Sequence, residues 1–543
     1  MSVYPDSIKL EMQFAGTAGA WTDVTEDVIR STPITCTYGI QDSSPLARVA
    51  STGTFNFSLN NSENNSAGLI GYYSPGHTNC RTGFQAGITV RFSVVYADVA
   101  YPKFYGRIPA SGIDIQPGSN KSRQTLVEVR DFIEQCAIHE IDSPAFVQSK
   151  TAAEVIALVL AEQSIQPLAT LYNTCEDTFF SAFEDQSIKL NCLKAISDAC
   201  LSEFGYAYIR HDSTNYEKFV VEGRKTRTGI TSATVISVTT PLASCGYLLK
   251  EDGGKFQLED GSGYIKLDEV TNYNSSFVNQ QINAVVENGN DLYNSIIVNS
   301  VPKTTGTAID VLYNMPAALA IPTTAVPGVG GAYIGNVAFS GNYNSGFVGL
   351  SLISPVIYVD YEAHPYSDGS GGNDSPDVSF SINNNNSSFN GTVNFNSGTG
   401  AAYSSWTFYL TKFNIRGTAL KIYTPVPSEY IGTASVNTFG KSTLDIDMPY
   451  QIGTATPGTV AQTLLTQYQD PITRTETVTL CANTDEQRMY SFLILDIGDR
   501  FTYEETVSGI NEDYFINGIN FEIYANNAIF FGYKTKQASL EVF

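Results

Sequence analysis

The residues that most often perform chemistry in proteins are few in this chain. It contains four histidines, His77, His139, His211 and His364. No two of them stand at HxH or HExxH spacing, and none has a cysteine partner at metal-binding spacing. A Ser-His-Asp triad assembles in space and is left open, but no GxSxG elbow supports one. The sequence therefore predicts no catalytic, cofactor-binding or metal-binding residue, and no enzyme.

One string suggests phosphate binding. Gly440-Lys441-Ser442 resembles the end of a P-loop, but that motif needs a glycine five positions earlier, where this chain has Ser435. The motif also needs a following helix, whereas residues 444–447 alternate as a strand does. We interpret the string as a turn. The neighbouring Asp445 and Asp447 are uninformative as a glycosidase pair, because carboxylates are abundant in so acidic a chain.

Calcium binding is a further interpretation to weigh. Three aspartates could form a cluster of oxygen ligands: Asp252, Asp260 and Asp268. Their spacing lacks the oxygen density of an EF-hand loop. Two of them begin Asp-Gly pairs, which are strong hairpin signals between alternating segments. We therefore predict a three-stranded meander over 246–269, with a calcium site in its loops as the alternative.

Composition limits the classes of function. The chain has 543 residues, enough for three to four domains, and a net charge of −23. Such acidity argues against sequence-independent or sequence-specific DNA binding, which depends on Lys and Arg at the phosphates. The negative charge would suit a surface past which DNA slides. Alternatively, it only keeps the protein soluble. No apolar stretch predicts a membrane-spanning helix or a signal peptide. The eight cysteines are widely spaced and are interpreted as reduced thiols.

The elements that would position any site are mostly strands. Between residues 49 and 131, four short runs rich in β-branched and aromatic residues are separated by Gly, Asn, Ser or Pro. Phe55, Phe57 and Leu59 alternate with polar residues in one run, and Ile88 to Val94 do so in the next. A period of two predicts strands with one buried and one wet face, as in a small barrel or sandwich.

Three helices are also predicted. Thr151 and Glu154 form a capping box before the first helix. The second begins near Asn191 and is expected to stop at Gly205. The third covers 457–470, with Thr456 as its cap and a proline in its first turn.

Residues 326–425 differ in composition from their surroundings. They are poor in charge and rich in Asn, Gly and Ser, with short strand-like runs that include 356–359. This pattern predicts an inserted β-sandwich. Its exposed Asn and Tyr residues and Trp406 would suit a sugar-binding surface, and an ordinary sandwich with polar loops is the alternative.

Several motifs occur in a recognisable order. TGTFNFSLNN, GYYSP, GFQAGITVRF, KFYGRI and TLVEVRD follow one another between residues 52 and 131. Later strings are EFGY at 203–206, IRG at 415–417 and DIGD at 496–499. In this order they resemble bacteriophage tail hub proteins, the minor tail or baseplate hub proteins that close the end of the tail tube.

The resemblance implies a mainly β fold with a small α+β part and two barrel-like β domains. The implied domains are a first barrel over 1–144, an α+β domain over 145–225, a linker over 226–284, a second barrel over 285–325 and 426–543, and the inserted sandwich over 326–425.

The resemblance also implies a structural role in the virion. Three copies would form a ring that matches a sixfold tube to a threefold tip and opens for DNA. Implied partners are the tail tube or distal tail protein and a tip, fibre or receptor-binding protein, with a tape-measure protein as a further candidate. No cofactor and no stable membrane insertion are expected. The alternative is a glycan-binding tail adhesin. A depolymerase spike would show a regular repeat, which the sequence lacks.

Overall fold

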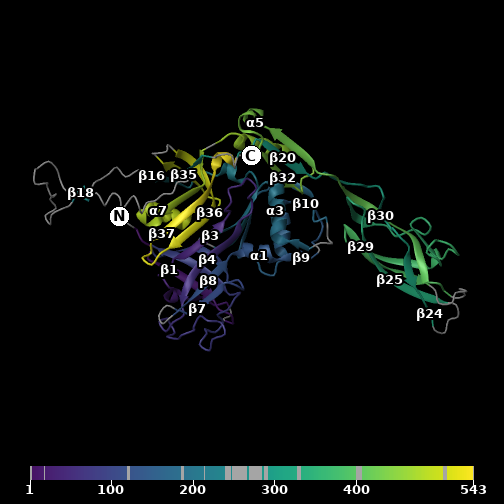
Figure 1. Ribbon diagram of the computed structural model, residues 1–543, viewed down its shortest axis with the longest axis horizontal. Helices are drawn as coiled ribbons and strands as arrows, with labels where there is room; N and C mark the ends of the chain where they lie inside the picture. The colour runs from purple at the N-terminus through teal and green to yellow at the C-terminus, as the bar shows by residue number, and fades with distance from the viewer. Residues whose placement is uncertain are drawn as a thin grey trace, which may run out of the picture.

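The computed structural model confirms a mainly β protein with a small α+β part. It describes residues 3–16, 19–118, 123–142, 144–184, 189–212, 215–238, 246–247, 266–267, 284–286, 292–326, 332–398, 407–471, 473–505 and 510–541. The molecule is elongated, and one β unit projects from the end of the main body (Figure 1). No helix among these residues is long and apolar enough to span a membrane.

The main body is organised around one large sheet that joins segments far apart in sequence. Its N-terminal strands are β1 (Ser7–Gln13), β2 (Thr22–Asp23), β3 (Ile34–Gly39), β4 (Ser51–Asn60), β5 (Thr89–Tyr96), β6 (Val99–Arg107), β7 (Ile113–Gln116) and β8 (Gln124–Arg130). Its later strands are β16 (Thr234–Val238), β34 (Thr477–Cys481), β35 (Arg500–Glu505), β36 (Ile510–Ile523) and β37 (Ile529–Gln537). The strand order is β16-β35-β36-β3-β4-β8-β6-β5-β1-β2, and β3 pairs antiparallel with β36.

This sheet curls around a shared aromatic core. The ring centroids of Phe55 on β4 and Phe92 on β5 are 4.9 Å apart, although two strands separate β4 from β5 in the sheet. Phe92 in turn lies 6.2 Å from Phe521 on β36. Phe55, Phe57 and Phe92 are buried, as predicted for β4 and β5. The predicted alternation is incomplete, because Ser58, Thr89 and Ser93, on the faces predicted to be wet, are buried as well. The strand path nevertheless runs open from β16 to β2, so no closed barrel is detected among the described strands.

The α+β part follows the first strands. Its helices are α1 (Phe132–Ile138), α2 (Ala152–Ala161) and α3 (Cys192–Glu203), and its strands are β9 (Glu140–Asp142), β10 (Val147–Thr151), β11 (Thr170–Tyr172), β12 (Thr178–Ala182), β13 (Lys189–Asn191), β14 (Tyr206–Arg210) and β15 (Lys218–Glu222). The capping box of Thr151 and Glu154 is confirmed. The predicted stop at Gly205 is wrong in detail: Phe204 takes the left-handed conformation, with φ of 61°. Gly205 is needed for another reason, because a Cβ there would lie 2.0 Å from the Glu222 carbonyl oxygen.

A small three-stranded sheet connects the body to the projecting unit. Its strands are β20 (Ser295–Ser300), β31 (Val426–Ile431) and β32 (Thr443–Met448), in the order β31-β20-β32. The helices α5 (Thr433–Phe439) and α6 (Ala455–Tyr468) accompany it. The predicted cap Thr456 is wrong, since α6 begins at Ala455 after Thr454 and already includes residue 456.

The projecting unit is a two-sheet sandwich with its own hydrophobic core. One sheet contains β21 (Lys303–Thr305), β22 (Asp310–Asn314), β23 (Leu319–Pro322), β26 (Phe347–Leu352) and β27 (Tyr361–His364), all paired with the long β30 (Thr407–Ile422). The other has the order β24-β25-β29-β28, from β24 (Thr324–Ala325), β25 (Tyr333–Asn342), β28 (Val378–Asn384) and β29 (Ser388–Asn396). Because β22 and β23 pair with β30, strands before residue 326 also belong to the sandwich.

The strand predicted over 356–359 is wrong. Asp360 folds this segment into a tight turn, because its carboxylate accepts from the Val356 amide at 2.7 Å and its own amide donates to the Val356 carbonyl at 2.6 Å. Arg416 holds the same carboxylate through an ion pair. Val356, Tyr358 and Val359 therefore lie exposed in a loop.

The remaining described elements are β17 (Gly246–Tyr247), β18 (Lys266–Leu267), β19 (Ala284–Val286), β33 (Thr473–Thr475) and α7 (Glu486–Ile494). β17 and β18 pair antiparallel. The Asp-Gly turns of the predicted meander, the three aspartates considered for calcium and Trp406 lie outside the described residues.

Candidate assembly surface and the junctions that position it

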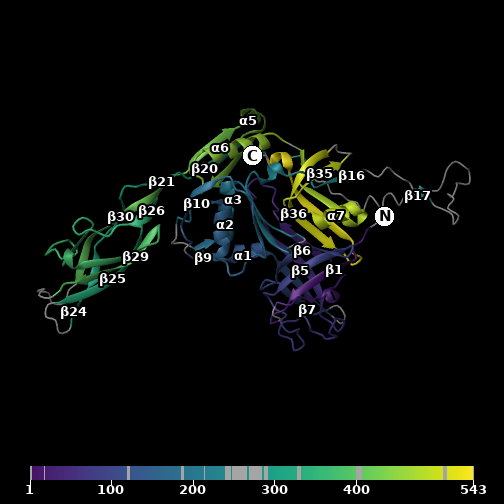
Figure 2. The same ribbon diagram turned by 180° about the vertical axis from the view of Figure 1, so that it is seen from behind.

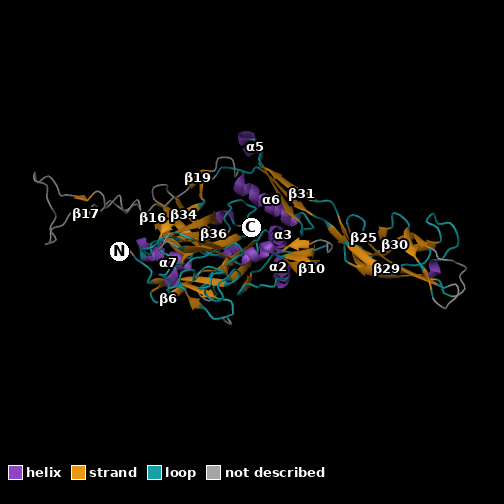
Figure 3. Cartoon of the chain, turned by 60° about the horizontal axis from the view of Figure 1, so that its bottom comes forward, coloured by secondary structure: helices purple, strands orange, loops and turns teal. Residues whose placement is uncertain are grey.

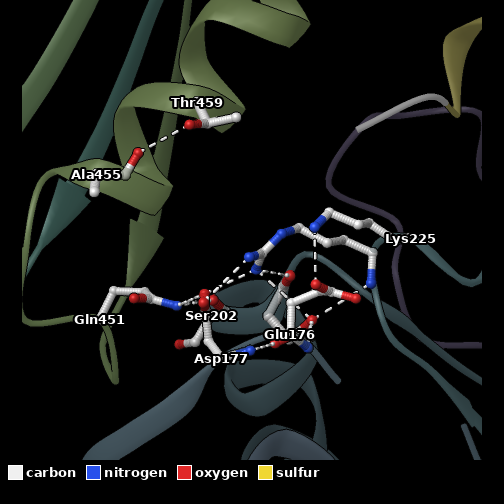
Figure 4. A network of polar contacts seen from close by, with 9 residues as sticks. Glu176, Asp177, Ser202, Lys225, Gln451, Ala455 and Thr459 are labelled. Carbon is white, nitrogen blue, oxygen red and sulfur yellow. Dashed lines mark hydrogen bonds and ion pairs between the residues drawn. The ribbon is translucent and has the colours of Figure 1, made fainter. Parts of the chain in front are cut away.

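A polar network fixes the connecting sheet on the α+β part (Figure 4). Arg224 donates to both oxygens of Asp177, at 2.8 and 3.1 Å. Gln451, in the turn between β32 and α6, donates to the Asp177 carboxylate at 2.6 Å and to the Ser202 carbonyl at 2.8 Å. Burial alone would raise the pKa of Asp177, but the hydrogen bonds and charge of Arg224 outweigh it and lower that pKa. The network therefore anchors the 449–451 turn to the end of α3.

The DIGD string forms a second junction, in which three parts of the chain meet. Asp496 accepts from the Tyr38 hydroxyl on β3 at 3.1 Å and from the His211 amide at 2.5 Å. Asp499 accepts from Arg210 on β14 at 2.7 Å. The motif that resembles the closing strands of tail hubs thus ties the α+β part to both halves of the large sheet.

A buried ion pair strengthens the same junction. Arg227 is fully buried, donates to Glu222 on β15 at 2.8 Å and donates to Asn517 on β36 at 2.7 Å. Its guanidinium also lies over the ring of Tyr206, 3.9 Å from the centroid. The carboxylate of Glu222 raises the pKa of Arg227, although burial opposes that shift. Arg227 therefore stays charged.

The histidines considered in the sequence lie apart. His77 accepts from the Asn79 amide at 3.1 Å in the loop between β4 and β5, and His139 follows α1. His211 is buried against Tyr38, and burial lowers the pKa of its imidazole, so the ring stays neutral at pH 7. His364 is on β27 in the sandwich. Within the described ranges, no group of three or more His, Cys, Asp or Glu residues is placed to hold a metal.

The other residues singled out in the sequence take structural positions. Asn299 donates to Asp445 at 2.8 Å and to Asp447 at 2.9 Å across neighbouring strands. The strand β32 follows Gly440-Lys441-Ser442, as predicted, where a P-loop would need a helix. Seven cysteines are described, and all of them are free thiols. Burial raises the pKa of Cys192 to about 11, so this thiol stays protonated.

Two carboxyl groups are buried together beneath α1. Asp131 caps α1 and leaves one carboxyl oxygen without a hydrogen-bond partner among the described residues. Glu217 accepts from the Leu168 amide at 3.3 Å. Both line a cavity of about 20 Å³, together with Arg107 and Arg130, which has room for about one water molecule. Burial raises the pKa of Asp131 to about 7 and that of Glu217 to about 8.

Stability is therefore expected to depend on pH in an unusual direction. Because both folded-state pKa values lie above those of the unfolded chain, the folded protein holds protons that the unfolded chain loses between about pH 4 and pH 8. This contribution should raise the urea midpoint as the pH is lowered through this window, against the opposite contributions of His211 and Asp177, whose pKa values are lowered in the folded protein. In the double variant Asp131→Asn/Glu217→Gln, which keeps the cap of α1, the increase should be smaller. An identical pH dependence in the variant and the original protein would contradict this account.

The surface best suited to a protein partner lies at β31 and α5. All of β31 except Ser428 is exposed, and β31 is an edge strand of the connecting sheet. We define the 426–439 surface by its exposed apolar residues: Val426, Tyr430, Ile431 and Phe439. The side chain of Phe439 is 51% exposed and that of Ile431 is 46% exposed. No other described strand pairs with the outer edge of β31. An edge strand with exposed apolar residues is a template for pairing with another chain. Figure 3 shows β31 and α5 at the outside of the molecule, beyond α6.

Solved structures of tail proteins, two of them from prophages, are similar to this chain over almost its full length. The prophage MuSo2 43 kDa tail protein from Shewanella oneidensis matches with 8% identity and a TM-score of 0.45, covering 98% of this chain and 99% of its own. A tail protein from Neisseria meningitidis MC58 matches with 8% identity and a TM-score of 0.46, covering 98% and 96%. Prophage tail protein gp18 from Listeria monocytogenes EGD-e matches with 8% identity and a TM-score of 0.37, covering 97% and 94%. No family model and no curated protein matches the chain.

Proposed function

We propose that this protein is a structural component of a bacteriophage tail, and within that class a hub at the end of the tail tube. The observation that carries the proposal is where the hub-like motifs lie. TGTFNFSL, TVRF, KFYGR and TLVEVR lie in β4, β5, β6 and β8 of one sheet, and DIGD directly precedes β35 of the same sheet. Strings far apart in sequence thus build a single structural unit.

The proposed mechanism is mechanical. Three copies form a ring that closes the tube, adapts its sixfold symmetry to a threefold tip, anchors tip, fibre or receptor-binding proteins and opens for DNA. The tail tube or distal tail protein and a tape-measure protein would be its neighbours in the virion. The domain limits at 144, 225, 284 and 425 and the absence of catalytic, cofactor and metal residues remain part of this proposal. The limit at 325 is withdrawn, because β22 and β23 pair with β30 of the sandwich.

A cyclic ring needs contacts between unlike surfaces of neighbouring copies. We assign the 426–439 surface to one side of that contact. About half of each of the side chains of Ile431 and Phe439 is exposed, so burying that half would contribute roughly 0.7–1.5 kcal/mol each to association. The edge strand would add backbone hydrogen bonds to the partner.

The direct test is the native mass of the purified protein by light scattering, with negative-stain images of the same sample. We expect three times the chain mass of 58.9 kDa and a ring with a central opening. A protein that stays monomeric at high concentration, and also with the tail tube protein present, would contradict the hub.

The double variant Ile431→Lys/Phe439→Lys should weaken association of the copies at least tenfold. The two lysines would place charge in an apolar contact and remove its buried area. Analytical ultracentrifugation over a concentration series measures this change. Val359→Lys, at an equally exposed apolar position on the sandwich, is the matched control and should associate normally. Equal weakening in both variants would show that the 426–439 surface is not the contact.

A further inference from the structure

One face of the sandwich has a composition found on no other sheet described above. The strands β25, β28 and β29 contain no Asp, Glu, Lys, Arg or His, although the chain as a whole has a net charge of −23. The facing sheet does carry charge, in the ion pairs Asp360–Arg416, Glu362–Lys412 and Asp310–Lys421. The contrast divides one small domain into a charged sheet and an uncharged one.

Side chains alternate between the two faces along each strand, and this decides which of them the uncharged sheet presents to solvent. Inward-facing residues such as Phe339 and Val393 pack in the sandwich core. Apart from Ile334, the outward-facing residues are small or carry amides and hydroxyls: Asn336, Ala338, Ser340, Asn342, Ser379, Ser381, Asn383, Asn390, Thr392, Asn394 and Asn396. Each amide and hydroxyl both donates and accepts hydrogen bonds. The face is therefore a regular array of neutral hydrogen-bonding groups.

The face is hollowed at its centre. A depression of about 520 Å³ is lined by Ala338 to Ser340 on β25, Ser381 and Asn383 on β28, and Asn390 to Thr392 on β29. Small side chains form its floor. Gly391 cannot be replaced without displacing backbone, because a Cβ there would lie 2.2 Å from the Ser381 carbonyl oxygen. Asn383 donates to Asn390 at 3.0 Å, so the two amides hold each other in place at one side of the hollow.

The hollow also lies where a large ligand can reach it. The strands β24, β25 and β29 form the end of the molecule that is farthest from β16 and α7, in both opposite views (Figures 1 and 2). No part of the main body covers this end in either view.

We propose that this hollow binds a neutral carbohydrate chain. Nucleic acid would need Lys or Arg at its phosphates, and these strands have neither. The core of a protein interface is rich in aromatic and apolar residues, whereas Ile334 is the one exposed large apolar residue on β25, β28 and β29. A membrane surface would need basic or apolar side chains. Sugar hydroxyls match amides and hydroxyls, and an uncharged ligand requires no counter-charge. This inference does not rest on the ring assembly.

The experiment uses the full-length protein and an array of neutral and acidic oligosaccharides, followed by titration calorimetry on the strongest neutral ligand. We expect at least one neutral oligosaccharide to bind, with an affinity that changes less than about twofold when salt is raised, because no counterions are released. Absence of binding to every neutral oligosaccharide, or binding to acidic ones alone, would overturn the proposal.

Two variants locate the site. Ser340→Trp fills the hollow and should abolish binding, and Asn390→Ala should weaken it at least tenfold. Asn342→Trp, on the same strand beyond the hollow, is the matched control and should bind as the original protein does. Circular dichroism checks that each variant is folded. If Ser340→Trp is folded and binds normally, the ligand lies elsewhere and the assignment to this hollow is wrong.

Discussion

Replacing Phe92 with alanine is expected to destabilise the early and the late strands of the large sheet together. The free energy of unfolding should decrease by about 3–5 kcal/mol, the usual cost of removing a buried aromatic ring. Phe92 has no exposed surface, and it contacts Phe55 on β4 as well as Phe521 on β36. The cavity would therefore open between segments from both halves of the chain.

Urea unfolding measures the size of this effect, and hydrogen exchange shows where it occurs. Peptides from β5 and from β36 should lose protection in parallel. Phe395→Ala is the matched control, because Phe395 is equally buried but stacks on Phe408 inside the sandwich, at 4.1 Å. It should deprotect the sandwich and leave β5 and β36 unchanged. Loss of protection in β5 alone after Phe92→Ala would mean that the two halves of the sheet unfold independently.

Replacing Arg227 with methionine should cost about 3–5 kcal/mol, because it leaves the Glu222 carboxylate buried without its cation. The side chain of Arg227 is 1% exposed and that of Glu222 is 4% exposed. The variant also loses the hydrogen bond to Asn517, which connects β15 to the late half of the sheet. The urea midpoint should be lower than in the original protein. Limited proteolysis should also cut the chain between the α+β part and the large sheet sooner than it does in the original protein.

Two further variants test the cause. Glu222→Gln in the Arg227→Met background removes the uncompensated charge and should recover part of the lost stability. Lys225 lies two residues before Arg227 and forms an ion pair with Glu176 at the surface. Lys225→Met breaks this pair and should cost less than about 1 kcal/mol. If Arg227→Met were no more harmful than Lys225→Met, the buried pair would not be holding this junction.

The sequence predicted the local elements better than their partners. Alternation in the runs at Phe55 and Phe92 showed which side chains are buried, because a strand with one wet face has a period of two. The same alternation carries no information about which strand lies alongside. The pairing of β3 with β36 was therefore invisible, and the two barrels expected from the resemblance meet in one open sheet.

Other errors have local causes. The apolar run at 356–359 has strand-like composition, but the Asp360 carboxylate closes it into a turn. The sequence predicts Gly205 as a helix stop, whereas a close approach to the Glu222 carbonyl oxygen is what requires glycine there. The short helices α1, α5 and α7 were missed, since seven to nine residues give too few turns for a periodic pattern.

The candidate surfaces differ in how far sequence could find them. The poverty of charge over 326–425 was visible and pointed toward the uncharged face of the sandwich. The 426–439 surface could not be found from the sequence, because Tyr430 and Ile431 are residue types that usually occur in buried strands, although both are exposed here. Only the arrangement β31-β20-β32 reveals that these residues lie on an edge strand.

The single sheet also has a consequence for synthesis of the protein. Arg30, beside β3, bonds to the carbonyl of Tyr524, 494 residues later in the chain. At roughly 5–20 residues per second, a ribosome needs about 25–100 s to make the intervening segment. During that interval the edge of β3 that will receive β36 is complete but unpaired. A nascent chain in this condition exposes an aggregation-prone strand, so efficient production of the protein should depend on chaperones that act before translation ends.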